Sequence, residues 1–283
     1  ILLDDSNLLL HTRPTAVDLK NILNIMLSLW SPKISNIPPL LDIYKSKALE
    51  LTTNLIDECQ AIAEAGLTLI KNDFNIITHC HTGAFATVDI GTAIAPMKLA
   101  AEKGYDIHVY VDETRPRFQG GKLTAWELEQ AGVPYTLITD STAASLMKAN
   151  KIDLAIVGAD RIARNGDFAN KIGTYNLAVI SSFHDVPFYS AAPWSTFHPD
   201  LMDGNEIPIE ERDSKEITHT ESNNGQELLL TYETKSVYNP AFDISPNSLL
   251  SGIIVPGQIL EKPFNESIEN IVIPNLKKKN MFE

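Results

Sequence analysis

Hydrophobic positions along the chain change their spacing near residue 75. Before it, apolar side chains recur every three to four residues, which predicts one helix after Pro14 and a second over residues 40–71. After it, short apolar runs alternate with helical segments. The predicted strands are 76–80, 107–111, 135–138, 154–157 and 188–191, and the predicted helices are 87–103, 123–131, 141–149 and 174–184.

This alternation of strands and helices is typical of crossover connections. It predicts an α/β fold in which a parallel sheet carries helices on both faces. The pattern divides the chain into a smaller, mainly helical N-terminal domain, 1–72, and an α/β domain, 73–283. Residues 207–236 are acidic and polar, and we expect them to leave the domain as a long excursion such as a hairpin.

Composition and charge narrow the classes of function. No run approaches the roughly 18 apolar residues of a membrane helix, and the first ten residues lack the pattern of a secretion signal. Two cysteines are too few for a disulfide scaffold, so we expect a cytoplasmic protein with reduced thiols. A net charge of −13 argues against non-specific binding of nucleic acid, but not against a small phosphorylated ligand. Because the chain begins with Ile1 and not with Met, we also expect a segment before it.

Chemistry is expected where the strands stop, because ligands of open parallel sheets bind beyond the carboxyl ends of the strands. The first predicted strand ends at Cys80, and turn amides there would favour a thiolate. The alternative is a small buried hydrophobic residue, which is what most free cysteines are. The fourth strand is followed by Asp160, a candidate acid or base; the alternative is a loop aspartate paired with Arg161 or Arg164.

Two further segments carry polar and cationic groups, one after the second strand and one after Asp160. The loop after the second strand contains Gln119 between arginines and a pair of glycines. Asn170 and Lys171 precede the predicted helix at Thr174, where an ammonium group and free backbone amides would form an anion site. The residues thus indicate a site for an anionic small molecule.

Neither a cofactor nor a metal is expected. No GxGxxG string follows a strand, which argues against a dinucleotide. A metal site on His79, Cys80 and His81 is unfavourable because consecutive strand residues point to opposite faces, and no second ligand pair occurs.

Several strings together resemble the methylthioribose-1-phosphate isomerase family of methionine salvage. They occur in the family's order from residue 11 to about residue 260 and include RPTAVDL (13–19), DETRPR (112–117), LTAW (123–126), TLITD (136–140), GADRI (158–162) and VYNPAFD (237–243). The resemblance implies a Rossmann-like domain after a helical N-terminal domain, a homodimer, and aldose–ketose isomerisation of a sugar 1-phosphate without a cofactor.

Carried over by position, the resemblance assigns roles to six residues. Cys80 and Asp160 match the catalytic pair, and the substrate-contacting positions fall on Arg13, Gln119, Asn170 and Lys171. The chain departs from the family at His81, where the family often has Asn, and lacks an earlier Arg-Gly-Ala-Pro phosphate motif, which we expect in a preceding segment.

Two alternatives remain open within the same fold. One is an isomerase of ribose 1,5-bisphosphate or 5-deoxyribose 1-phosphate. The other is a non-catalytic regulatory subunit of the eukaryotic initiation-factor nucleotide exchange complex, which generally lacks the Cys/Asp pair that this chain retains.

Overall fold

A twisted sheet forms the centre of the molecule in the computed structural model, which describes residues 2–12, 17–30, 37–222, 224–279 and 281. The strands are short, and most of their residues are buried. In the described part of the chain the sheet has seven strands, in the spatial order β13 (Gln258–Leu260), β12 (Gly252–Val255), β7 (Phe188–Ala191), β4 (Leu154–Val157), β1 (Asn75–Thr78), β2 (His108–Asp112) and β3 (Tyr135–Ile138).

The predicted α/β fold is confirmed. Neighbouring strands from β3 to β12 pair in parallel, and β13 closes one edge in antiparallel fashion. β1 and β4 lie side by side at the middle of the sheet. The strand order runs from β1 to β2 and β3 on one side, and from β4 to β7 and β12 on the other, as in Rossmann-like folds. The five strands expected from the sequence are all present within two residues of their predicted ends.

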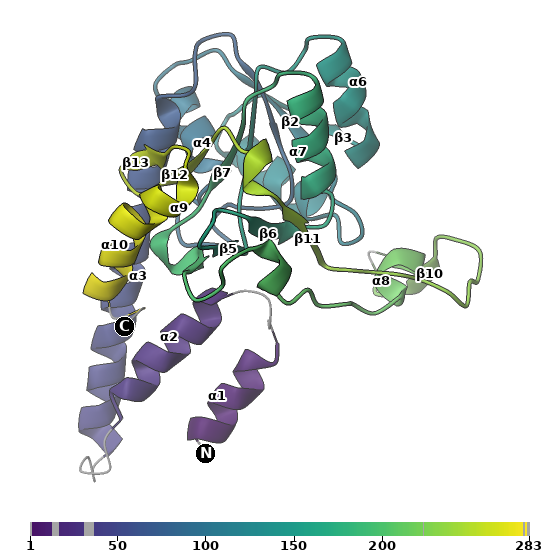
Figure 1. The fold of residues 1–283 in the computed structure, drawn as a ribbon. Coiled ribbons are helices and arrows are strands. Elements are labelled where there is room, and N and C mark those ends of the chain that lie inside the picture. The colour runs from purple at the N-terminus through teal and green to yellow at the C-terminus, as the bar shows by residue number, and fades with distance from the viewer. Residues whose placement is uncertain (1, 13–16, 31–36, 223, 280, 282–283) are drawn as a thin grey trace.

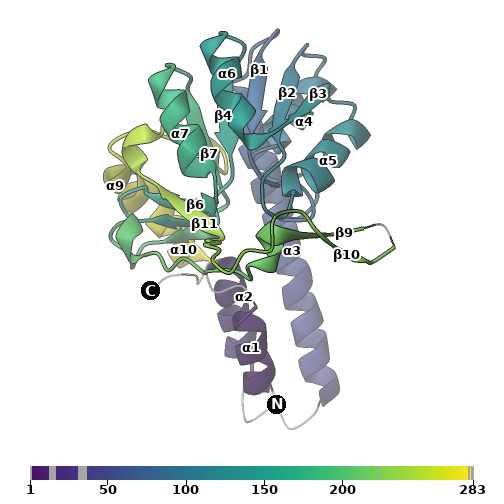
Figure 2. The same cartoon turned by 90° about the vertical axis from the view of Figure 1, so that its right-hand side faces the viewer.

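Helices cover both faces of the sheet, because successive strand residues point to opposite sides. On β1, Ile76 packs into one apolar cluster and Ile77 into the other. The first cluster includes residues of α3 (Ile37–Leu67), α4 (Ala95–Glu102) and α5 (Ala125–Gln130). The second includes residues of α6 (Ala143–Lys148), α7 (Thr174–Phe183) and α10 (Ile273–Lys278). Figures 1 and 2 together show these helices around the strands.

The N-terminal region is helical, as predicted. It consists of α1 (Leu2–Leu10), α2 (Val17–Ser28) and the N-terminal part of α3, which extend away from the sheet (Figure 2). The C-terminal part of α3 instead packs against the sheet domain through Ile62 and Ala65. The division into 1–72 and 73–283 stays a prediction, which limited proteolysis would test. Among the described residues, no helix is both long and apolar enough to cross a membrane.

The helix predicted over 87–103 begins later than expected. Residues 84–94 form turns, and α4 starts at Ala95 with Pro96 in its first turn. The Thr92 N–H donates to the carbonyl of Thr82 at 2.7 Å, so the chain folds back on itself before the helix begins. This loop forms part of the wall of the site described below.

A smaller sheet, which the sequence did not predict, lies at the carboxyl end of the main one. Its strands, in spatial order, are β11 (Phe242–Ser245), β6 (Phe168–Lys171), β5 (Arg161–Ala163) and β8 (Phe197–His198). The acidic excursion does contain the expected hairpin, formed by β9 (His219–Glu221) and β10 (Glu227–Leu229) after the short α8 (Lys215–Thr218). It projects from the body of the molecule (Figure 1). The last helices of the described residues are α9 (Phe264–Ser267) and α10.

Candidate active site

A cavity of about 390 Å³ lies beyond the carboxyl ends of β1 and β4, the two neighbouring central strands. Its walls come from segments that follow strands of the main sheet, from the smaller sheet and from helix α2. The structure brings together five of the six residues marked out by the sequence, since the cavity is lined by Cys80, Gln119, Asp160, Asn170 and Lys171. The sixth, Arg13, lies outside the described residues.

Cys80 is held in a left-handed backbone conformation two residues after the end of β1, with φ +69°. A non-glycine residue there costs on the order of 1–3 kcal/mol, and such strain persists only where the surroundings enforce it. Two buried threonines do so. Cys80 N–H donates to Thr114 Oγ1 at 2.8 Å, and Thr124 Oγ1 donates to the Cys80 carbonyl at 2.6 Å. The thiol side chain is partly exposed, whereas the other cysteine, Cys59, is buried in α3.

Asp160 follows β4 and connects the main sheet to the smaller one. Its backbone N–H donates to the carbonyl of Ala169 on β6 at 2.8 Å, which fixes the residue between the two sheets. The side chain is partly exposed and lines the cavity. The carboxylate thus reaches the same space as the Cys80 thiol from the neighbouring strand.

Asn170 and Lys171 lie on β6, a strand that the sequence did not predict, and they precede the expected helix, α7. Two backbone amides at the start of that helix donate to Asp243, so they are not free for an anion as expected. The Asn170 amide donates to Thr174 Oγ1 at 2.9 Å. The Lys171 ammonium lies 4.3 Å from the centroid of the Phe242 ring, and Phe242 also lines the cavity. A cation over an aromatic face is held in place and can still attract an anion.

Gln119 reaches the cavity from the loop after β2. Its Oε1 is buried and accepts no hydrogen bond in the part of the chain that the structure describes, so a ligand hydroxyl could donate to it. The following Gly120 has no room for a side chain, because a Cβ would lie 1.7 Å from the carbonyl oxygen of Asp112. Glycine therefore allows the loop to approach the end of β2 and carry Gln119 inward.

Several further cavity residues were not marked out as site residues by the sequence, among them Asp18, Leu19 and Arg212. Asp18 and Leu19 of α2 line the cavity. Their signal was present, since both belong to the RPTAVDL string that carried the resemblance. Arg212 also lines it and pairs with Glu216 at 3.0 Å. The acidic segment around Arg212 gave no local indication of a site.

His81 is a buried part of the cavity wall, although the family often has Asn at this position. Its Nδ1 lies 3.1 Å from Thr124 Oγ1, whose single proton is already donated to the Cys80 carbonyl, so Nδ1 is the donor. Nε2 lies 3.5 Å from the Glu127 carboxylate, which in turn binds Lys98 at 2.9 Å. Burial lowers the pKa of His81, and the charge of Lys98 adds to this against the opposing effect of Glu127. His81 therefore supports the Cys80 backbone as a neutral ring.

The lowered pKa of His81 predicts a pH-dependent difference between wild type and His81→Asn. The folded state disfavours the protonated ring. Below the unfolded pKa of about 6.5 the unfolded chain therefore binds more protons than the folded chain, and the free energy of unfolding decreases as the pH is lowered. We expect the free energy of unfolding in urea to fall more from pH 7.5 to pH 5 for wild type than for His81→Asn. Asn has no such titration, and its amide can still donate to Thr124. Equal losses in both proteins would contradict this reading.

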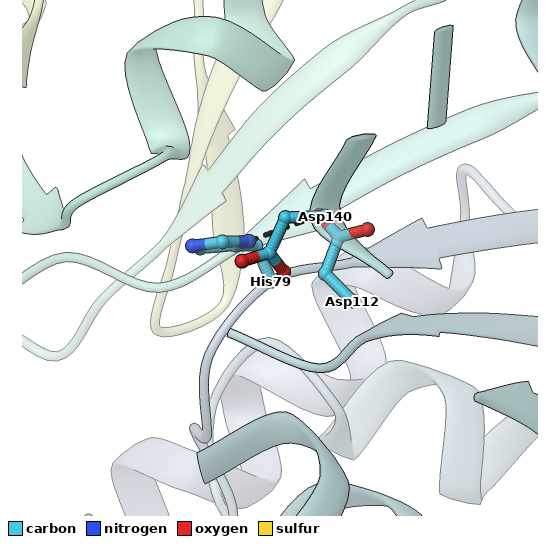
Figure 3. A group of neighbouring side chains, drawn as sticks. All are labelled: His79, Asp112 and Asp140. Atoms are coloured by element: carbon cyan, nitrogen blue, oxygen red, sulfur yellow. Dashed lines mark hydrogen bonds and ion pairs between the residues drawn. The ribbon is translucent and has the colours of Figure 1, made fainter. Parts of the chain in front are cut away.

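Beneath the cavity, His79, Asp112 and Asp140 form a compact cluster (Figure 3). Their candidate ligand atoms lie within 4.8 Å of one another, so by distance alone this group could hold a metal ion. Most of its polar atoms have other partners, however, and among the described residues Asp112 Oδ1 is the exception. His79 Nδ1 lies 2.9 Å from Asp112 Oδ2, and the two Asp140 oxygens accept the backbone N–H groups of Thr114 and Arg115 at 2.7 and 2.8 Å. The rings of His79 and His81 turn to different partners, so they do not form a common site with Cys80.

Comparisons with known proteins agree on one family. The model of the initiation factor 2 subunit family matches residues 2–256. Methylthioribose-1-phosphate isomerase of Desulforamulus reducens is 44% identical over 261 residues, which cover 92% of this chain and 74% of that protein. The crystal structure of 5-methylthioribose 1-phosphate isomerase from Pyrococcus horikoshii has a TM-score of 0.84 at 35% identity, covering 95% of this chain and 74% of that one. A structure described as translation initiation factor eIF-2B, subunit delta, from A. fulgidus has a TM-score of 0.80 at 33% identity, covering 96% and 78%.

Proposed function

The chain belongs to the initiation factor 2 subunit family, and we propose that it acts as an aldose–ketose isomerase on 5-methylthioribose 1-phosphate. The product is 5-methylthioribulose 1-phosphate. The observation that carries this proposal is the placement of Cys80 and Asp160 at the tips of two neighbouring strands, on one shared cavity. The isomerases at 44–46% identity support the same activity.

The chemistry is an internal oxidation and reduction. C2 of the sugar changes from an alcohol to a ketone, and C1 becomes a methylene group, so no external oxidant or reductant is needed. The phosphate on C1 prevents formation of a free aldehyde. The ring must therefore open by cleavage of the bond between C1 and the ring oxygen, while a proton is delivered to that oxygen.

Asp160 and Cys80 divide the proton transfers in this proposal. Asp160 delivers the proton to the ring oxygen and takes up the proton of the C2 hydroxyl as the carbonyl forms. Cys80 acts at C1 and C2: as a thiolate it moves the C2 proton to C1, or its side chain shields a direct hydride shift between these carbons. Both routes conserve atoms and electrons.

The remaining cavity residues bind the substrate in this proposal. Lys171 supplies a positive charge for the phosphate, while Asn170 and Gln119 offer amide groups to hydroxyls. Arg13 is carried over as a fourth contact by the resemblance. The reaction is expected to need neither cofactor nor metal, which stays a prediction from the sequence.

A coupled assay of the purified chain tests the proposal. The substrates are 5-methylthioribose 1-phosphate, ribose 1,5-bisphosphate and 5-deoxyribose 1-phosphate, and turnover is expected to be fastest with the first. Deuterium from the solvent at C1 of the product would indicate proton transfer, and its absence a hydride shift. No turnover with any of the three would reject the enzyme and favour a regulatory role, to which the similarity to the A. fulgidus structure points.

The proposal also includes the oligomeric state of the protein and its location in the cell. We expect a homodimer, for which light scattering would report twice the mass of one chain. We also expect a cytoplasmic enzyme, since a sugar phosphate is an intracellular metabolite and neither cysteine forms a disulfide in the described part of the chain. Fractionation of cells that express the tagged protein tests the location.

A further inference from the structure

The ring of His79 connects three segments that surround the cavity. It follows β1, directly before Cys80, and is 1% exposed. Its Nδ1 lies 2.9 Å from Asp112 Oδ2 at the end of β2, and its Nε2 lies 2.9 Å from the carbonyl of Ile172. Ile172 follows Lys171 at the end of β6, so one buried side chain joins the strand that carries Cys80 to the strand that carries Lys171.

The partners of the ring determine where its protons are. A carbonyl oxygen only accepts hydrogen bonds, so Nε2 carries a proton and donates it to Ile172. Nδ1 shares a second proton with Asp112, and Asp140 places another carboxylate beside the pair (Figure 3). Burial acts to lower the pKa of His79, but the hydrogen bond and charge of Asp112, helped by Asp140, raise it. Asp112 thus fixes the orientation in which Nε2 faces Ile172.

The backbone around Ile172 is fitted to this ring. Gly173 has φ +103°, and a Cβ at this position would lie 2.8 Å from His79 Cε1. On the other side, Asp243 accepts the N–H groups of Gly173 at 2.7 Å and of Tyr175 at 3.0 Å. The ring therefore packs directly against the main chain that leads from Lys171 into α7.

We propose that His79 is a positioning residue of the site, which sets the place of Asn170 and Lys171 relative to Cys80 through its hydrogen bond to Ile172. The inference rests on the proposed function, because Asn170 and Lys171 are substrate contacts only if the cavity binds the sugar phosphate. His79 does not line the cavity and acts through its neighbours. A displacement of about 1 Å in binding groups can cost on the order of 100-fold in rate, which makes such a link consequential.

Two substitutions of His79 distinguish the contribution of Nδ1 from that of Nε2. The amide nitrogen of asparagine occupies roughly the place of Nδ1, and that of glutamine the place of Nε2. Both are made in the Asp112→Asn background, so that neither leaves an unpaired carboxylate in the core. The glutamine double variant, His79→Gln/Asp112→Asn, keeps a donor to Ile172. The asparagine double variant, His79→Asn/Asp112→Asn, loses it.

The result expected is a difference between these matched variants in the assay with 5-methylthioribose 1-phosphate. The asparagine double variant should have kcat/KM at least about 10-fold below that of the glutamine double variant, with a raised KM, because the substrate contacts are displaced. The glutamine double variant should stay within about threefold of Asp112→Asn alone. Equal kcat/KM values in the two double variants would overturn the proposal and leave His79 with a packing role.

A second measurement does not depend on activity. Amide hydrogen exchange in residues 172–175, followed by mass spectrometry, should be faster in the asparagine double variant than in the glutamine double variant. Equal exchange rates in the two double variants would also overturn the proposed role of the hydrogen bond from His79 to Ile172. If the wild-type chain turned over none of the three sugar phosphates, the proposed function would fail, and the exchange rates would still decide the role of His79.

Discussion

A Cys80→Ser variant is expected to turn over 5-methylthioribose 1-phosphate at least about 100-fold more slowly than the wild-type chain. Serine has nearly the shape of cysteine, and it bears the same backbone strain at φ +69°. The two threonine contacts to the backbone of residue 80 are also retained. What is lost is the readily ionised thiol, so the effect should appear in kcat with an unchanged melting temperature. Near-normal turnover would remove Cys80 from the mechanism.

The second cysteine of the chain provides the control for this experiment. Cys59 is fully buried in α3, and burial raises the pKa of its thiol to about 11. It therefore stays protonated and unreactive at neutral pH. Cys59→Ser should keep kcat within about threefold of wild type. In that variant iodoacetamide can modify only Cys80, and the sugar phosphate should slow both the labelling and the loss of activity.

The main sheet could be predicted because its strands carry their own signal. All four residues of β4 are buried and apolar, which is typical of a strand covered on both faces. The smaller sheet has no such signal. β5 has three residues, including Arg161, and β6 pairs with β11, about 70 residues later in the sequence. Its pairing is decided by contacts between distant segments, which a local pattern does not contain.

The site could be predicted in part for a similar reason. Cys80 and Asp160 follow parallel strands, and the carboxyl ends of such strands meet at one edge of the sheet. The partners that fix them are not local. Thr114 and Thr124 hold Cys80 from 34 and 44 positions away, and the bond from His79 to Ile172 spans 93 positions. A hydrogen bond between a side chain and a distant backbone group cannot be predicted from the local spacing of residues.

An Asp160→Asn variant is expected to lower kcat by at least about 100-fold, with a smaller change in KM. The amide has the size of the carboxylate and can still form hydrogen bonds to the substrate. It can neither deliver a proton to the ring oxygen nor accept one from the C2 hydroxyl. The backbone N–H of residue 160, which donates to Ala169, is unchanged, so the local fold should be retained. The measurements are steady-state kinetics and the melting temperature.

The control for this variant is an exposed carboxylate at the other end of the sheet. Asp106 lies just before β2 begins at His108, away from the cavity, so Asp106→Asn should leave kcat within about threefold of wild type. Residual activity of Asp160→Asn close to wild type would contradict the assignment.

The double variant Cys80→Ser/Asp160→Asn gives a further test. If the thiol and the carboxylate act on one transition state, the combined loss should be much smaller than the product of the single losses, because either substitution alone already disables the shared step.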